Sequence, residues 1–279
     1  MLHTLSQRAL SFLGHRPTAP ALARPAQAAD PPHAATAAMV SGPAPWAIAT
    51  RNLDVIFNPE SQPPLQALRS VDLAVRKGHI QMVVGPSGAG KTTLLLTLSG
   101  LLTPTRGNVT LLDQPLGQLS RPRLDDFRRC HLGIMFQESN LFRALTALEN
   151  VEAALFVKGW RTVEARREAK RVLAQVGLGD REDYLPRQLS GGQQQRVAVA
   201  RSLAGAPDIL VADEPTASLD SVSGERVMAS IRQLVKQQDT TAVIATHDAR
   251  ILSFADDIAE LLDGVLSDCS PPHDSSGLS

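Results

Sequence analysis

The chain has 279 residues, of which 43% are hydrophobic, a length and composition that suit one large globular domain or two small ones. Its 28 basic and 28 acidic residues balance, so no overall basic field indicates nucleic acid as a partner. The two cysteines, Cys130 and Cys269, lie far apart and outside any CxxC pattern, which argues against a disulfide framework and a zinc site and for a reducing compartment. No run reaches the roughly 18 apolar residues that a membrane-spanning helix needs.

Residues 1–45 differ from the rest of the chain in composition. They are rich in Ala and Pro and contain no acidic residue before Asp30. This composition is typical of a disordered leader, which we predict here, and it resembles a targeting peptide more weakly. Met39 is an alternative start of translation.

Short β-type runs begin after this leader. We predict strands over Trp46–Ala49, Leu53–Phe57 and Leu68–Val75, the last with alternating apolar residues. The stretch Asn58–Pro64, which contains Pro and Asn, is typical of a hairpin loop between the second strand and the third. The first folded part of the chain is therefore predicted to be rich in β-structure.

A phosphate-binding loop is the strongest local motif. The stretch from Gly85 to Thr93 fits G-x-x-x-x-G-K-[ST], with the buried strand Ile80–Val84 before it and leucines at helical spacing after it. Glycines let successive backbone N–H groups converge on phosphate oxygens, and the helix dipole adds positive potential. Lys91 reaches the β and γ phosphates of a nucleotide, and the Thr92 hydroxyl can ligate Mg²⁺. The predicted ATP contacts in this loop are Gly85, Pro86, Ser87, Gly88, Ala89, Gly90, Lys91, Thr92 and Thr93.

Two strands and a helix are predicted between this loop and the middle of the chain. Gly107–Leu112 is typical of a strand, and the stretch Ser120–Pro122 indicates the start of a helix. A further apolar run, Leu132–Phe136, predicts a strand that ends at Gln137.

The middle of the chain is predicted to be helical. Thr146–Glu149 has the spacing of a capping box, and a second helix runs from about Thr162 to Val176. In Leu189–Gln193, glycines precede helix-forming residues, so we expect another helix N-terminus that is open to an anion. This second phosphate-binding surface consists of Ser190, Gly191 and Gly192.

Two more buried strands follow. Asp208–Glu214 ends in two acids, the loop Thr216–Asp220 leads into a helix, and Thr241–Ala245 is a strand followed by His247. Strands that alternate with helices predict a parallel sheet, whose carboxyl edge carries the ligand site. After Gly264 the chain is rich in Ser, Pro and Asp, which predicts a disordered tail.

Over roughly Ala47–Val265 the chain resembles the ATP-binding cassette family. The resemblance rests on six motifs in the family's order: the phosphate loop, the glutamine loop at Gln137, the signature Leu189-Ser-Gly-Gly-Gln193, the strand ending in Asp213-Glu214, the D-loop Ser218-Leu-Asp220 and the switch His247. It implies an α/β fold, in which a P-loop NTPase (RecA-like) parallel-sheet core carries an antiparallel β subdomain and an inserted α-helical subdomain. The domains that we predict are the disordered leader 1–45, the nucleotide-binding domain 46–266 with its helical subdomain at about 138–202, and the disordered tail 267–279.

The resemblance also implies chemical roles. Asp213 would orient Mg²⁺ through water, Glu214 would polarise the attacking water, and His247 would contact the γ-phosphate and position Glu214. Gln137 would touch the metal or the water. The aromatic that stacks on adenine is predicted to be Phe57, for which core packing is the alternative. The predicted catalytic set is Lys91, Gln137, Glu214 and His247; the metal set is Thr92, Gln137 and Asp213; the D-loop residue is Asp220.

The signature implies a second copy of the chain. The phosphate loop caps the sheet, whereas Leu189, Ser190, Gly191, Gly192 and Gln193 belong to the helical insertion, so the two are not expected to hold the same nucleotide within one subunit. The resemblance implies a head-to-tail homodimer that sandwiches two ATP molecules, and hydrolysis would open it. The other implied partner is an integral membrane permease, which would hold the chain at the cytoplasmic face of the inner or plasma membrane. No nucleic-acid partner is expected.

Two stretches refine the resemblance. Phe136–Phe142, followed by Leu145–Val151, is similar to the exporter branch that contains the LolD, MacB and DevA ATPases. Thr246–Leu252, followed by Ala255–Ile258, is most similar to the DevA type, which works with a separate permease and a periplasmic adaptor. We therefore predict an ATPase that energises export of a lipid-like or other amphipathic substrate. Two alternatives remain: a soluble cassette ATPase of iron–sulfur assembly, and a cassette that drives a non-transporting membrane regulator of cell-wall enzymes.

Overall fold

The computed structural model describes residues 46–58, 64–217 and 219–269. Four predicted features fall outside them in whole or in part: the leader 1–45, the centre of the hairpin loop (59–63), Ser218 of the D-loop and the end of the tail, 270–279. The predicted domain boundaries therefore stay predictions. Among the residues described, no helix is both long and apolar enough to cross a bilayer.

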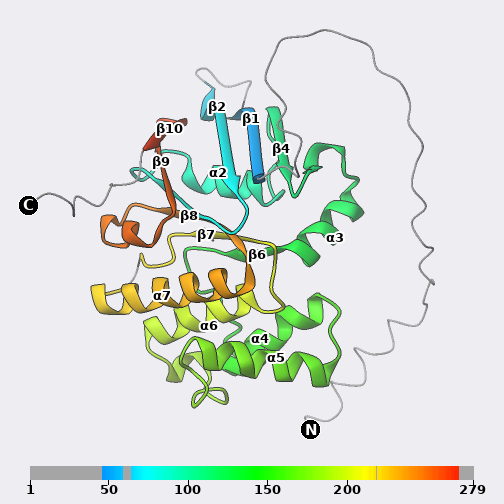
Figure 1. Ribbon diagram of the computed structural model, residues 1–279, viewed down its shortest axis with the longest axis vertical. Helices are drawn as coiled ribbons and strands as arrows, with labels where there is room; N and C mark the ends of the chain where they lie inside the picture. The colour runs from blue at the N-terminus through cyan, green and yellow to red at the C-terminus, as the bar shows by residue number, and fades with distance from the viewer. Residues whose placement is uncertain (1–45, 59–63, 218, 270–279) are drawn as a thin grey trace, which may run out of the picture. The chain divides into compact units, whose positions relative to one another are not determined.

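A six-stranded sheet in the order β10-β9-β3-β8-β7-β6 forms the core (Figure 1). Its neighbouring strands from β9 to β6 are parallel, whereas β10 runs antiparallel to β9. The predicted parallel core is confirmed, and each predicted core strand is present to within about a residue at either end. The strands are β3 (Ile80–Val84), β6 (Leu132–Met135), β7 (Ile209–Asp213), β8 (Thr241–Thr246), β9 (Asp257–Leu262) and β10 (Val265–Cys269).

Helices follow most of these strands. They are α2 (Lys91–Leu98), α3 (Arg121–His131), α4 (Ala147–Val157), α5 (Thr162–Gln175), α6 (Gly191–Leu203) and α7 (Ser221–Gln238), with the short 3₁₀ helices η1 (Leu116–Gln118), η2 (Pro186–Gln188) and η3 (Ala249–Phe254). The helices α4, α5 and α6 pack on one another, as expected for a helical insertion (Figure 1). The predicted capping box of α4 is present, because the Glu149 N–H donates to Thr146 Oγ1 while the Thr146 N–H donates to Glu149 Oε2.

The central strands β3, β7 and β8 are almost wholly buried because both faces of the sheet are covered. On β7, Leu210 and Ala212 belong to the cluster that includes residues of helices α4 to α7. The alternate residues, Ile209 and Val211, belong to the other cluster, formed with α2 and the antiparallel sheet described next. Alternate residues of the apolar strand β7 therefore pack against two different layers, one on each face of the sheet.

The antiparallel sheet corrects one detail of the sequence analysis. Its order is β2-β1-β4-β5, and the two strands predicted before Asn58 form a single strand of 12 residues, β1 (Trp46–Phe57). A register shift between Thr50 and Leu53, with Asn52 at φ 48°, makes this break a bulge rather than a turn. The other strands are β2 (Leu65–Arg76), β4 (Arg106–Leu111) and β5 (Gln114–Pro115).

The C-terminal strand is a second correction. Disorder is predicted after Gly264 and, as a domain boundary, from residue 267, but β10 occupies Val265–Cys269 and pairs with β9. Asp263 (φ 48°) and Gly264 (φ 81°) form the connection, with Val265 opposite Leu262. Two consecutive residues at positive φ are typical of the tight turn that the right-handed twist of a hairpin favours. The polar composition of this segment therefore reflects an edge strand rather than disorder.

Candidate nucleotide-binding site

A cleft of about 780 Å³ lies beside the residues that follow β3, β7 and β8, within the range of roughly 300–1,000 Å³ typical of ligand sites. Parallel strands end at one edge of a sheet, which explains why residues distant in sequence meet here. The predicted residues Gly85, Pro86 and Ala89 do not line the cleft. Those that do are Phe57, Ser87, Gly88, Gly90, Lys91, Thr92, Thr93, Gln137, Asp213, Glu214 and His247.

Two glycines let the phosphate loop lie close to neighbouring strands. A Cβ at Gly85 would lie 2.2 Å from the carbonyl oxygen of Leu261, and a Cβ at Gly90 would lie 2.5 Å from that of Ala67. Gly90 also has φ 105° and forms the N-cap of α2 without a side-chain cap. The loop backbone therefore packs directly against β2 and β9, and the first N–H groups of α2 remain available to an anion.

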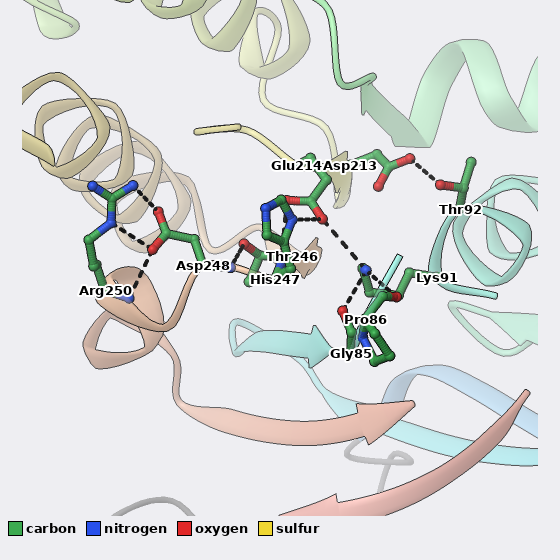
Figure 2. Close-up of polar contacts among 10 residues, drawn as sticks. All are labelled: Gly85, Pro86, Lys91, Thr92, Asp213, Glu214, Thr246, His247, Asp248 and Arg250. Carbon is green, nitrogen blue, oxygen red and sulfur yellow. Dashed lines mark hydrogen bonds and ion pairs between the residues drawn. The ribbon is translucent and has the colours of Figure 1, made fainter. Parts of the chain in front are cut away.

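Lys91 is the first residue of α2 and is buried. Its Nζ donates to the carbonyl oxygens of Gly85 at 2.7 Å and Pro86 at 3.1 Å. The same atom lies 3.6 Å from Glu214 Oε1 (Figure 2). The only acid in contact with this amine, among the described residues, is thus the one that the sequence predicts to act on water.

Asp213 and Thr92 are brought together at the end of β7. Thr92 Oγ1 donates to Asp213 Oδ2 at 2.7 Å, while Asp213 Oδ1 is buried and has no hydrogen-bond partner within the described residues. Burial raises the pKa of Asp213, and the hydrogen bond from Thr92 opposes that shift. Because Mg²⁺ prefers oxygen ligands, a hydroxyl beside an unpartnered carboxylate oxygen fits the predicted ion.

Glu214 and His247 form a second close pair in the cleft. His247 Nδ1 lies 2.7 Å from Glu214 Oε1, and the His247 N–H donates weakly to Oε2 at 3.4 Å (Figure 2). The Glu214 backbone, at φ 48°, stays attached to β8 because its N–H donates to the carbonyl oxygen of Ala245. An ionised carboxylate only accepts, so the imidazole donates from Nδ1 and keeps Nε2 for another partner. The geometry holds Glu214 in one orientation.

Gln137 and Phe57 also line the cleft. Gln137 follows β6 and also lines a second cleft of about 710 Å³, which contains Gly191. Phe57 is the last residue of β1 and is 36% exposed, so it is not a core residue. Its stacking on adenine stays a prediction, as does the contact of Gln137 with metal or water.

The signature residues do not line the cleft of Lys91. Ser190 is the N-cap of α6, accepting from the Gln193 N–H at 3.3 Å while its own N–H donates to Gln193 Oε1 at 2.8 Å. The predicted second helix N-terminus is therefore present. It is separate from the first within one chain, because none of Leu189, Ser190, Gly191, Gly192 and Gln193 belongs to that cleft.

Two arginines near the site, Arg250 and Arg201, were not predicted from the sequence. Asp220, which was predicted, caps α7 by accepting from the Ser223 N–H at 3.0 Å. Near it, Arg250 contacts Asp248, the residue after the predicted switch histidine. At the far end of α6, Arg201 donates to the carbonyl oxygens of the two residues that follow Glu138, at 2.7 and 2.8 Å. No local spacing signals the contacts of Arg201 with the Gln137 segment or of Arg250 with Ser221, because they join segments that are 61 and 29 residues apart in the sequence.

Comparisons with known proteins agree with this geometry. A sequence model of a family described as ABC transporter matches residues 68–217. The lipoprotein-releasing system ATP-binding protein LolD of Shewanella denitrificans is 44% identical over 202 residues, which are 72% of this chain and 87% of that protein. The uncharacterized ABC transporter ATP-binding protein YbbA of Escherichia coli K12 is 42% identical over 204 residues, 73% of this chain and 90% of that protein.

A solved structure is similar over most of its length. The ATP-binding cassette MJ0796, described as a dimeric post-hydrolysis state bound to ADP and Pi, has a TM-score of 0.72 and 36% sequence identity. The match covers 79% of this chain and 98% of that one. The cassette cbiO1 from Clostridium perfringens has a TM-score of 0.74 and 26% identity, over 81% of this chain and 89% of the other.

Proposed function

This chain belongs to the ABC transporter family as an ATP-binding and ATP-hydrolysing subunit of the LolD/YbbA-type branch, and from that premise we propose that it energises an exporter of a lipid-like or other amphipathic substrate. The name of LolD, an ATP-binding protein of a lipoprotein-releasing system, supports this substrate class. The likeness to DevA and the periplasmic adaptor stay predictions.

Each residue of the cleft has a separate proposed role in ATP hydrolysis. Lys91 binds the β and γ phosphates of ATP, and Glu214 takes a proton from the attacking water. His247 holds Glu214 through the 2.7 Å contact of Nδ1, which leaves Nε2 to face the γ-phosphate. Thr92, Gln137 and Asp213 would hold Mg²⁺, which supplies charge neutralisation at the phosphates when it is bound.

We propose that two copies share each nucleotide. The observation that carries this proposal is the separation of the two anion-binding helix N-termini: Lys91 lines the cleft and Ser190 does not. A second chain placed head to tail would bring its Ser190 and Gly192 to the γ-phosphate. The solved structures of MJ0796, which are described as dimeric, support this arrangement. Loss of the γ-phosphate then removes the shared contact and opens the dimer.

A mixing experiment tests the shared site. The chains Lys91→Ala and Ser190→Arg should each lose ATPase activity alone, since every site of either homodimer is defective. In a 1:1 mixture the mixed dimer has one intact site, made from Lys91 of one chain and Ser190 of the other, so activity should return to about a quarter of the wild-type rate or less. A mixture as inactive as its components would contradict sharing between copies.

A matched variant controls for the lost helix cap. Ser190 and Thr146 form equivalent capping boxes, on α6 and α4. Replacing either one costs about 1 kcal/mol of helix stability. Thr146→Arg should therefore lower the melting temperature as much as Ser190→Arg does, yet hydrolyse ATP at the wild-type rate.

The membrane partner is proposed to be a permease that holds the chain at the cytoplasmic face of the inner or plasma membrane. An apolar groove of about 520 Å³ beside the segment of Gln137 supports this proposal. Its walls include the exposed side chains of Phe136, Phe142 and Val157. A cytoplasmic segment of the permease seated there would act directly on the Gln137 loop. Co-purification of a polytopic membrane protein with the wild-type chain, lost in Phe142→Asp, would support the proposal; a soluble scaffold complex instead would overturn it.

The substrate class has its own test. Purified complex in vesicles should hydrolyse ATP faster when an amphipathic or lipid-linked substrate is added. Absence of any stimulation by such substrates would favour the alternative of a regulator that transports nothing.

A further inference from the structure

Asp248 holds the loop that carries His247 to the end of β8. Its backbone N–H donates to Oγ1 of the buried Thr246 at 3.0 Å, and its side chain caps η3 by accepting from the Arg250 N–H at 3.0 Å. The same carboxylate forms a bidentate pair with the guanidinium group of Arg250, which donates from Nε to Oδ1 at 2.8 Å and from Nη2 to Oδ2 at 2.7 Å (Figure 2). A bidentate pair fixes direction as well as distance.

Arg250 continues this link to a second loop. Its Nη1 donates to Ser221 Oγ at 2.6 Å. Ser221 is the first residue of α7 and directly follows Asp220, the N-cap of that helix. One side chain therefore connects the residue after His247 with the residue after Asp220. Asp248 directly follows His247, which the proposed mechanism uses, and Ser221 directly follows Asp220, the predicted D-loop residue.

The link is not needed to keep η3 on α7. Ile251 of η3 is buried at 1% exposure, and Arg232 of α7 donates from Nη1 to the carbonyl oxygen of Phe254 at 2.6 Å. These contacts attach η3 to the body of α7, whereas Arg250 reaches only the first residue of the helix. Half of the Arg250 side chain is exposed, and it does not line the ATP cleft. The Arg250 side chain thus connects the loop after β8 with the start of α7 and does not contribute to the hydrophobic core.

We propose that Arg250 is a positioning residue for ATP hydrolysis, which ties the His247 loop to the Asp220 turn and so fixes the orientation in which His247 meets Glu214. The inference rests on the proposed function, since it assigns Arg250 to the same hydrolytic site. The two loops come from the ends of different strands, and a rigid tie makes them one unit. The hydrogen bonds from Arg250 also lower the pKa of Asp248, which keeps this carboxylate ionised and paired.

Steady-state ATPase kinetics of the full-length chain test the inference. Arg250→Ala should lower kcat about 5- to 30-fold and leave KM within about twofold, because the misplaced group acts after nucleotide has bound. Arg250→Lys keeps the charge but cannot bridge two carboxylate oxygens and Ser221 together, so its kcat should fall between those of Arg250→Ala and the wild type. An Arg250→Ala chain with unchanged kcat, or with a raised KM alone, would overturn the inference.

A double-mutant cycle separates the tie from a general loss of packing. Ser221→Ala removes the acceptor at the far end and should lower kcat about two- to fivefold. When Arg250 is already Ala, the same change at Ser221 should have no further effect, because the contact no longer exists. Equal effects of Ser221→Ala in both backgrounds would show that the two residues act independently, which contradicts the tie.

Arg171 supplies the matched control. It forms an equivalent bidentate pair with Glu168 on α5, at 2.7 Å for both contacts, and lies outside the cleft. Arg171→Ala should retain the wild-type kcat, while its melting temperature should match that of Arg250→Ala within a few degrees. If the wild-type chain itself shows no turnover, the proposed function fails and this inference with it. Wild-type turnover together with an unchanged Arg250→Ala variant defeats the inference alone.

Discussion

Lys91 Nζ lies 3.6 Å from Glu214 Oε1, and each side chain is less than a tenth exposed. The group proposed to bind phosphate and the group proposed to activate water thus neutralise one another. A γ-phosphate bound at Lys91 competes with Glu214 for the same amine. Binding of the nucleotide would therefore release Glu214, the proposed base, from its ion pair with Lys91.

The first prediction concerns Glu214. Glu214→Gln removes the charge that competes for Lys91, so the variant should bind Mg-ATP more tightly than the wild type and form a stable dimer. Its hydrolysis should be slower by at least about 100-fold, because the amide cannot accept a proton from water. Light scattering with ATP reports the dimer, and phosphate release reports the rate. Rapid turnover would remove Glu214 from the mechanism.

The second prediction concerns Lys91. Lys91→Ala loses a charge-assisted contact with phosphate, so the Kd for ATP should rise about 10- to 100-fold. Lys77→Ala is the matched control, since Lys77 also pairs with an acid, Asp239 at 3.4 Å, but is 64% exposed. Titration calorimetry should give the wild-type Kd for Lys77→Ala. Equal affinities of the two variants would argue against phosphate binding by Lys91.

The third prediction uses the half-buried Lys158, whose Nζ donates to the carbonyl oxygen of Ala204 at 2.7 Å. Burial lowers the pKa of Lys158 from 10.5 to about 8. Below pH 8 the amine is protonated whether the chain is folded or unfolded, so the cost of burying the charge is fully present. Between about pH 8 and 10.5 the unfolded chain binds more protons, so this residue's contribution to stability becomes more favourable as pH rises.

The variant Lys158→Met isolates this effect. Its free energy of unfolding relative to the wild type should fall by on the order of 1–2 kcal/mol between about pH 7 and pH 10, because the wild type alone sheds its burial cost. Urea unfolding at several pH values measures the difference. A flat difference for Lys158→Met would contradict the buried-cation account.

The fourth prediction concerns the hairpin beside the cleft. Gly264 has φ 81°, and a Cβ there would lie 2.7 Å from the carbonyl oxygen of Ala67. Gly264→Ala should therefore destabilise the chain by about 1–3 kcal/mol and weaken ATP binding, because the turn lines the cleft. Gly117→Ala, with nothing within 4 Å of its Cβ, should leave thermal melting within about a degree of wild type. A Gly264→Ala variant as stable as the Gly117→Ala variant would sink this explanation.

Local interactions explain why most of the site could be predicted. The phosphate loop and the capping box of α4 join residues three to six positions apart, so the sequence spacing itself encodes the geometry. The acids after β7 and His247 after β8 follow from one further rule, that parallel strands end at a common edge. The continuity of β1 across its bulge and the strand β10 were not predicted. Asp263-Gly264 is a turn dipeptide that signals the hairpin between β9 and β10, but the residues after it are rich in Ser, Pro and Asp, a composition that is also typical of disorder.

Side-chain contacts between distant segments could not be predicted. Arg201 and Arg250 reach partners that are 61 and 29 residues away in the chain. An arginine is flexible and has five donors, so its partner depends on how whole elements pack. Only the folded chain identifies these two arginines among the many exposed ones.

The helix α6 connects the signature residue Ser190, proposed to contact the partner's nucleotide, with the segment that follows Gln137. It begins at the capped Ser190 and ends near Arg201, whose guanidinium holds the backbone that follows Gln137. A helix of 13 residues is a stiff rod about 20 Å long. If a second subunit displaces the end of α6 at Ser190, the end at Arg201 would therefore move as well, because the helix moves as one rigid body. The segment after Gln137, next to the proposed permease site, would then move with the helix.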